Sequence, residues 1–167
     1  MDILKNNKIN FNKENLKQNL ISIFVVLIVF ALDRFTKIKI IENQNDNFKI
    51  YINEFINLDL IWNTGIGFGL LSTSSSIIYN SISILILAIV IFLISIIIKS
   101  NFTEKILFSL IVGGAIGNLF DRATYFAVPD FIDVHYQNYH WFTFNIADIF
   151  ITLGISMIII KDLILKR

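Results

Sequence analysis

The stretch Phe144-Asn145-Ile146-Ala147-Asp148 opens an apolar run that continues to Leu165. At about 1.5 Å of rise per residue, a helix of this length crosses a hydrocarbon core of about 30 Å. Asp148 is therefore a carboxylate inside a predicted membrane span, and no cation is near it in the sequence. A charge in hydrocarbon is disfavoured by roughly 2.5–3.5 kcal/mol on insertion scales, so such a residue normally faces a functional interior.

Three further apolar stretches bring the expected number of spans to four. The 167 residues are 55% hydrophobic and only 16% charged, which predicts a mainly α membrane protein with one integral membrane domain over residues 1–167. A basic segment before Leu20–Leu32 also suits a cleaved signal peptide. However, Asp33-Arg34-Phe35-Thr36-Lys37 follows it in place of a small-x-small cleavage site, so we expect a retained first span. The predicted spans are about 20–38, 76–98, 106–121 and 144–165.

Two polar excursions, about 39–75 and 122–143, separate the spans. Lys49–Trp62 alternates weakly between apolar and polar residues, which predicts short strands. The second excursion is predicted to be a loop with interface aromatics. Gly65, Gly67 and Gly69 break regular structure, but without a βαβ context they do not indicate a nucleotide site. The expected fold is four transmembrane helices with a small extracytoplasmic β element and a second extracytoplasmic loop.

The distribution of basic residues predicts the orientation. With four spans both termini lie on one side, together with the loop between the second and third spans. That side carries nine Lys and Arg residues and the other side carries five. By the positive-inside rule we expect both termini in the cytoplasm, in a multi-pass protein of the bacterial cytoplasmic (inner) membrane.

Composition excludes several kinds of site. The chain has no Cys, which rules out disulfides, thiolate chemistry and Cys-linked lipid on this protein. His135 and His140 are too few for a zinc site without several carboxylate ligands, and we expect them to be interfacial or solvated. No basic block interleaves with aromatics, so we expect no nucleic-acid partner. The sequence predicts no metal and no cofactor.

Polar residues of three spans converge at the outer ends of those spans. Asn145 and Asp148 share a helix face, as do Asn118 and Asp121. Asp33 and Lys37 are four residues apart, and for them a purely local ion pair is an alternative. Such convergence at one depth predicts a site near the outer face.

A second aspartate precedes the last span in Val128-Pro129-Asp130-Phe131. Pro129, the only proline of the chain, constrains the backbone ahead of Asp130. Asp133 is a rival for the same role. Two carboxylates that share a site cannot both ionise easily, so one keeps a proton. The ionised one can take a proton from water while the protonated one polarises a carbonyl, which is peptide hydrolysis without a metal.

Five segments of the chain, in order over roughly residues 21–160, resemble the lipoprotein signal peptidases (signal peptidase II). They are Asp33-Arg34-Phe35-Thr36-Lys37, Asn63-Thr64-Gly65, Gly113 through Arg122 (GGAIGNLFDR), Val128-Pro129-Asp130-Phe131-Ile132-Asp133 and Phe144 through Asp148. The resemblance implies a membrane aspartic endopeptidase with Asp130 and Asp148 as the catalytic dyad. It also implies that the pocket is built or supported by Asp33, Lys37, Asn63, Gly65, Asn118, Asp121, Arg122 and Asn145.

The resemblance further implies the partners. The family cleaves bacterial prolipoproteins on the N-terminal side of a diacylglyceryl-modified cysteine, so we expect such substrates, contact with membrane lipid and a monomeric enzyme. Two positions depart from the family pattern. Ile66-Gly67-Phe68-Gly69 follows the Asn-x-Gly motif, which predicts a more flexible loop, and Pro129 replaces a residue that is often Val.

Two non-enzymatic alternatives remain. A small proton- or ion-coupled carrier would use Asp148 as a relay, but it needs polar positions along the spans, and their cytoplasmic halves are nearly all apolar. A structural assembly subunit would leave the intramembrane Asp148 unexplained.

Overall fold

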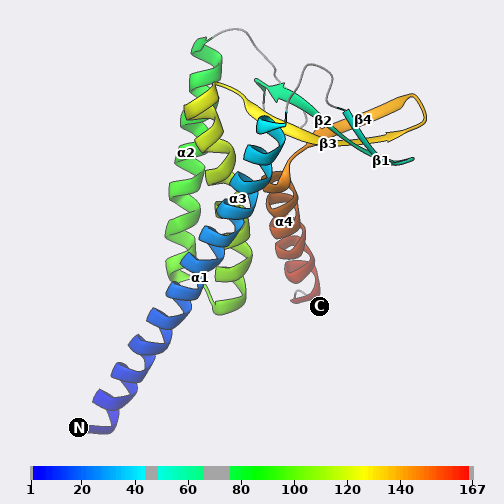
Figure 1. Cartoon of the computed structure of the whole chain (residues 1–167). Helices are drawn as coiled ribbons and strands as arrows, with labels where there is room; N and C mark the ends of the chain where they lie inside the picture. Colours follow the sequence, from blue (N-terminus) through cyan, green and yellow to red (C-terminus); the bar gives the residue numbers. More distant parts are fainter. Residues whose placement is uncertain (1, 44–48, 66–75, 166–167) are drawn as a thin grey trace.

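The structure is a computed structural model that describes residues 2–43, 49–65 and 76–165. Its described part contains four helices beneath one four-stranded sheet (Figure 1). The helices are α1 (Asp2–Glu42), α2 (Ser76–Lys99), α3 (Phe102–Tyr125) and α4 (Ile146–Leu165). The strands are β1 (Lys49–Asn53), β2 (Ile56–Asn63), β3 (Val128–Tyr136) and β4 (Tyr139–Phe144).

Helix α3 is the centre of the bundle and contacts the other three helices. Its start is fixed by Asn101, whose side chain accepts a hydrogen bond from the Glu104 amide at 3.1 Å. Glycine allows the closest helix contact. A Cβ at Gly114 would stand 2.5 Å from the carbonyl oxygen of Ala147, so α4 lies directly on α3 at this point. This contact holds the first turn of α4 against the middle of α3.

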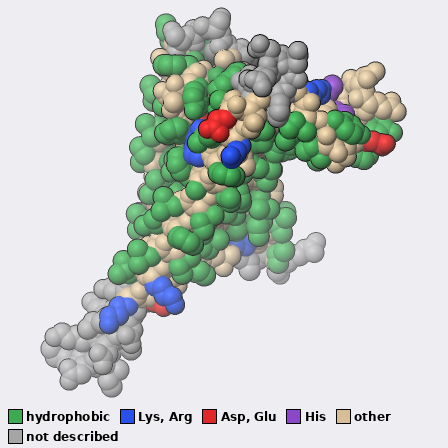
Figure 2. All heavy atoms as spheres, viewed as in Figure 1, with side chains coloured by type: hydrophobic (Ala, Val, Ile, Leu, Met, Phe, Trp, Pro, Cys, Tyr) green, Lys and Arg blue, Asp and Glu red, His purple; other side chains and the backbone are tan. Residues whose placement is uncertain are grey.

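The outer surface of the bundle is apolar. Hydrophobic side chains cover the helices on the face shown in Figure 2, and charged side chains on that face lie mainly near the sheet and at the lower part of α1. Within the described residues, α2 over Ile77–Lys99 and α3 over Phe102–Tyr125 are long and apolar enough to cross a membrane. Large side chains such as Ile77 and Phe92 are 77% and 63% exposed. Exposed apolar surface on this scale is typical of helices that face lipid.

The first helix is much longer than the predicted span. It begins at Asp2, whereas hydropathy placed its start near residue 20. Hydropathy reports only the apolar part of a helix, so the polar residues before Leu20 lie outside the predicted span although they belong to α1. The predicted bounds of the second span agree with α2. Helix α3 is longer than the third predicted span by four residues at each end, and α4 begins two residues later than the fourth predicted span.

The sheet joins the two excursions. Its order is β1-β2-β3-β4 with every pair antiparallel, so β2 pairs with β3 although α2 and α3 lie between them in the chain. The strands predicted within Lys49–Trp62 are confirmed as β1 and β2. The predicted second loop is wrong over its greater part, because β3 and β4 form a hairpin there. Its strand signal was hidden, since the first four residues of β3 are buried in succession and show no alternation.

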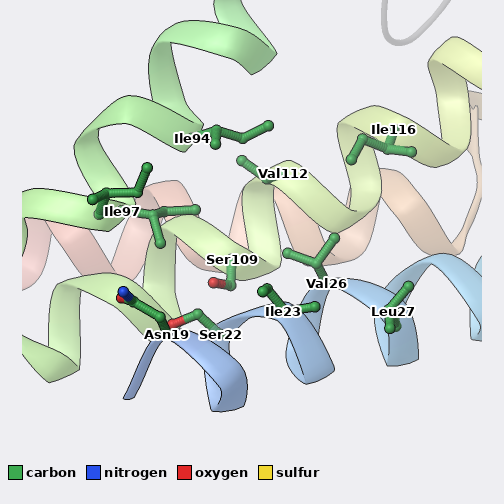
Figure 3. Close-up of a pocket in the computed structure, with 11 residues that line it drawn as sticks. Asn19, Ser22, Ile23, Val26, Leu27, Ile94, Ile97, Ser109, Val112 and Ile116 are labelled. Atoms are coloured by element: carbon green, nitrogen blue, oxygen red, sulfur yellow. The ribbon is translucent and has the colours of Figure 1, made fainter. Parts of the chain in front are cut away.

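A groove of about 330 Å³ lies between α1, α2 and α3 (Figure 3). Isoleucine, leucine and valine side chains supply most of its lining. Its two hydroxyls are already paired, because Ser22 donates to the Gln18 carbonyl at 3.0 Å and Ser109 to the Lys105 carbonyl at 2.6 Å. This groove therefore offers no free polar group from its serines.

Candidate active site

Two aspartates from different elements meet at one asparagine. Asp130 lies on β3 and Asp148 in the first turn of α4. The Asn145 side-chain amide donates to Asp130 Oδ1 at 2.6 Å, and the Asn145 backbone amide donates to Asp148 Oδ2 at 3.3 Å. In return, Asn145 Oδ1 accepts from the Asp148 amide at 3.1 Å. Asn145 is thus the N-cap of α4 in a reciprocal capping arrangement, and it links both carboxylates.

Asp130 is held by a second amide from the neighbouring strand. The Asn63 side chain at the end of β2 donates to Asp130 Oδ2 at 2.8 Å. The other end of that side chain accepts from the Gly65 amide at 2.8 Å, which closes a tight turn after the strand. Arg122 donates to the Gly65 carbonyl. These contacts give a physical reason for the Asn-x-Gly spacing, since the turn aims Asn63 at a carboxylate that is only 2% exposed.

Asp148 is oriented from the bundle. The Asn118 side chain on α3 donates to Asp148 Oδ1 at 2.8 Å, and its own oxygen accepts from Lys37 Nζ at 2.8 Å. The ammonium fixes which end of the Asn118 amide is the acceptor. The amide nitrogen must therefore point at Asp148.

Lys37 is the centre of a buried ion cluster beneath this pair. It is fully buried and also donates to Asp33 at 2.8 Å and Asp121 at 2.6 Å, while Arg34 pairs with Asp121. Asp33 Oδ1 in turn accepts from the Ala147 amide at 3.0 Å, in the first turn of α4. The Asp33–Lys37 pair is therefore not merely local. It connects α1 and α3 to the helix that carries Asp148.

The charges of the site balance only if one carboxylate holds a proton. The acidic groups are Asp33, Asp121, Asp130 and Asp148, and the basic groups are Arg34, Lys37 and Arg122. All but Asp148 are at most 8% exposed. Four carboxylates against three cations leave one negative charge too many, and burying an unpaired charge is costly. A single proton on the two aspartates removes the excess.

Burial is the main reason that the pKa of Asp130 is raised. The pKa of Asp130 is raised from 3.8 to about 6, chiefly by desolvation and secondly by the nearby Asp148 charge. The amides of Asn63 and Asn145 oppose this rise in pKa because they stabilise the ionised form. Asp130 therefore changes protonation close to neutral pH.

This pKa predicts a pH-dependent stability. Between about pH 4 and 6 the unfolded chain has ionised Asp130 while the folded protein keeps it protonated, so stability falls as pH rises through this window. The difference between 3.8 and about 6 corresponds to about 3 kcal/mol. In detergent, the melting temperature of Asp130→Asn should fall less than that of wild type between pH 4 and 7. Asp59→Asn, at a half-exposed carboxylate, should follow wild type. Parallel curves for wild type and Asp130→Asn would contradict the prediction.

The structure brings all ten predicted site residues into one connected set of hydrogen bonds. They are Asp33, Lys37, Asn63, Gly65, Asn118, Asp121, Arg122, Asp130, Asn145 and Asp148. Arg34 was missed as a member, although it stands beside Asp33 in the sequence. Pro129 is accommodated within β3 opposite Trp62. The Gly67 departure and most of the residue 66–75 segment lie outside the described residues.

The rival aspartate has different partners. Asp133 is 3% exposed, and its carboxylate lies 2.8 Å from His140 Nδ1 and 3.9 Å from Lys49 Nζ. The expectation that the histidines are solvated is wrong for His135, which is only 6% exposed, and an interfacial position stays a prediction. Among the described residues, no three His, Cys, Asp or Glu side chains are grouped so that they could hold a metal ion.

Comparison with known proteins identifies relatives across almost the whole chain. The family model described as Signal peptidase (SPase) II matches residues 25–164. A lipoprotein signal peptidase of Pelagibacter ubique is 49% identical over 91% of this chain and 93% of its own length. One from Anaplasma phagocytophilum is 36% identical, over 89% and 95%.

Two solved structures share the fold. Both are described as bacterial membrane enzymes determined by the in meso method, at 2.3 and 1.9 Å resolution. The first has a TM-score of 0.73 at 30% identity and covers 85% of this chain and 87% of its own. The second has a TM-score of 0.70 at 31% identity and covers 84% and 90%.

These relatives define the class of protein as a signal peptidase, which decides against the carrier and assembly-subunit alternatives. The chain belongs to the signal peptidase II family.

Proposed function

We propose that this protein is an aspartic endopeptidase that removes the signal peptide of bacterial prolipoproteins, on the N-terminal side of a diacylglyceryl-modified cysteine. Asp130 and Asp148 activate a water molecule between them. The observation that carries the proposal is the bridge made by Asn145, which donates to both carboxylates. Family membership supports the substrate class.

The chemistry follows from one proton shared by two carboxylates. The ionised aspartate takes a proton from water as the water oxygen attacks the scissile carbonyl, and the protonated aspartate donates to the carbonyl oxygen. The carbon–nitrogen bond then breaks and the leaving amine takes a proton from the pair. The charge count of the site and the raised pKa of Asp130 support a resting state with one proton.

The proposed location is the bacterial cytoplasmic membrane, crossed four times, with both termini in the cytoplasm and the site near the outer face. The start of α1 and the end of α4 lie at the end of the bundle opposite the sheet, which supports this topology (Figure 1). The enzyme acts as a monomer in contact with membrane lipid, and the outer segments around the sheet cover the lipid-modified substrate.

One precursor in two forms tests the proposal. Purified enzyme should cleave the diacylglyceryl-modified precursor at the bond before its cysteine. The same precursor without lipid should react at least about 100-fold more slowly, because remote binding energy is lost. Mass spectrometry of the products reports both site and rate. Equal rates would contradict the lipid requirement, and an intact lipidated precursor would contradict the peptidase assignment.

A further inference from the structure

A second groove begins at Asp148. It has a volume of about 450 Å³ and lies between the end of β4 and the exposed side of α4. Its lining residues are Phe142, Phe144, Asp148, Ile149, Thr152, Leu153 and Ser156. Thr152, Leu153 and Ser156 are exposed, so the groove is open along the helix. This apolar surface groove therefore has Asp148, a proposed catalytic carboxylate, at one end.

The polar residues of this groove form a line. Asp148, Thr152 and Ser156 follow one another at intervals of four residues, which places them on one face of α4. At about 1.5 Å per residue the line is about 12 Å long. It extends from the first turn of α4 away from the sheet.

The hydroxyls of Thr152 and Ser156 differ from those elsewhere in the bundle. Other described Ser and Thr hydroxyls beyond the first turn of a helix donate to a carbonyl of their own helix, at Ser22, Thr36, Ser81, Ser83, Ser95, Ser109 and Thr124. Within the described part of the chain, neither Thr152 nor Ser156 has a hydrogen-bond partner. The groove of Figure 3 has paired hydroxyls, and this one does not.

Unpaired hydroxyls facing lipid are unfavourable, because hydrocarbon offers no partner. A ligand that brings hydrogen-bond acceptors into the groove would remove this cost. The last four carbonyls of any helix lack partners within that helix, so a substrate helix that ends in the groove brings such acceptors. Acyl chains carry no acceptor along their length and would leave both hydroxyls unpaired.

We propose that this groove binds the C-terminal turn of the substrate's signal-peptide helix, with Thr152 and Ser156 donating to its last carbonyls. The inference rests on the proposed function and assigns a position to one part of that substrate. Small side chains at both positions let the substrate helix approach α4 closely. The groove ends at Asp148, so a helix that ends beside Thr152 and Ser156 leaves about two to four extended residues to reach the bond to be cut. Thr152 and Ser156 are positioning residues in this account.

Paired variants test the inference kinetically. Thr152→Val with Ser156→Ala removes both hydroxyls with little change of volume, and KM should rise about 5- to 50-fold while kcat changes by less than about 2-fold. Thr152→Leu with Ser156→Leu fills the groove and should raise KM at least as much. The matched controls are Ser81→Ala/Ser95→Ala and Ser81→Leu/Ser95→Leu on exposed positions of α2, which should keep the wild-type KM. A wild-type KM in both groove variants would overturn the inference.

Cross-linking identifies the occupant. The chain has no Cys, so Ser156→Cys introduces a single thiol, and Asp130→Asn in the same protein keeps the substrate uncut. A precursor with one added cysteine in the last turn of its signal helix should form a disulfide with it. The control variant Ser95→Cys should not form this disulfide. Cross-linking of residue 156 to a photoreactive acyl chain, without a disulfide to the helix, would overturn the inference. Cleavage by Asp130→Asn would instead contradict the proposed function.

Discussion

Asp148→Asn and Asp130→Asn are each expected to reduce kcat for a diacylglyceryl-modified precursor by about 10²–10⁴-fold or more, because each removes one half of an acid–base pair. Asparagine has nearly the same shape as aspartate, so both variants should fold. KM should change little, since neither carboxylate is needed to hold the signal helix or the lipid. The measurement is single-turnover cleavage by the purified variants, with thermal unfolding as the test of folding.

Asp133→Asn is the matched control. Asp133 belongs to the same strand, is as deeply buried as Asp130 and also accepts hydrogen bonds, but its partners are His140 and Asn57. Its replacement should cost stability without abolishing cleavage. Full activity in Asp130→Asn, or loss of activity only in Asp133→Asn, would contradict the proposed dyad.

Lys37→Met is expected to have the largest effect on stability. Lys37 compensates Asp33 and Asp121 where all three side chains are fully buried, and removing one partner of a buried ion pair typically costs about 3–5 kcal/mol. Activity should also fall, because Asn118 loses the ammonium that orients its amide toward Asp148. The loss should therefore affect kcat as well as the melting temperature measured in detergent.

Two further variants show whether charge is the cause. Lys49→Met removes a half-exposed lysine that lies 3.7 Å from Asp59, and it should cost less than about 1 kcal/mol. Adding Asp33→Asn to Lys37→Met removes the carboxylate left without its cation, so the double variant should be more stable than Lys37→Met alone. If the double variant is the less stable one, packing rather than charge explains the effect.

The polar residues of the site could be predicted because they are out of place in their surroundings. A carboxylate or an amide within an apolar run is costly to bury and normally has a function. Asp33, Asn118 and Asp148 could therefore each be recognised as candidate site residues. Their spacing placed them at one end of the bundle. The selection of Asp130 over Asp133 came from the family resemblance, since both fit the same local pattern.

The partners of these residues could not be predicted from the sequence. Asn63 meets Asp130 only because β2 pairs with β3, and the strand signal of β3 is hidden by burial on both faces. In the sequence, Arg34 cannot be distinguished from other charged residues near the ends of the spans. Only the structure shows that it pairs with Asp121. The unpaired hydroxyls of Thr152 and Ser156 cannot be distinguished by sequence from the paired ones on α2.

The contact between Asp33 and the Ala147 amide has a consequence for how the enzyme matures. These residues are 114 positions apart, and Asp130 depends on Asn63, which is 67 positions away. Contacts this distant in the chain form late in folding, because the intervening loop must be closed first. The link from Asp130 through Asn145 to Asp148 is local in the chain, but its attachment to β2 and to α1 therefore forms only once the final helix has docked. A chain that lacks α4 therefore lacks Asp148 and the amide that Asp33 binds, so the proposed dyad can be assembled only at the end of synthesis.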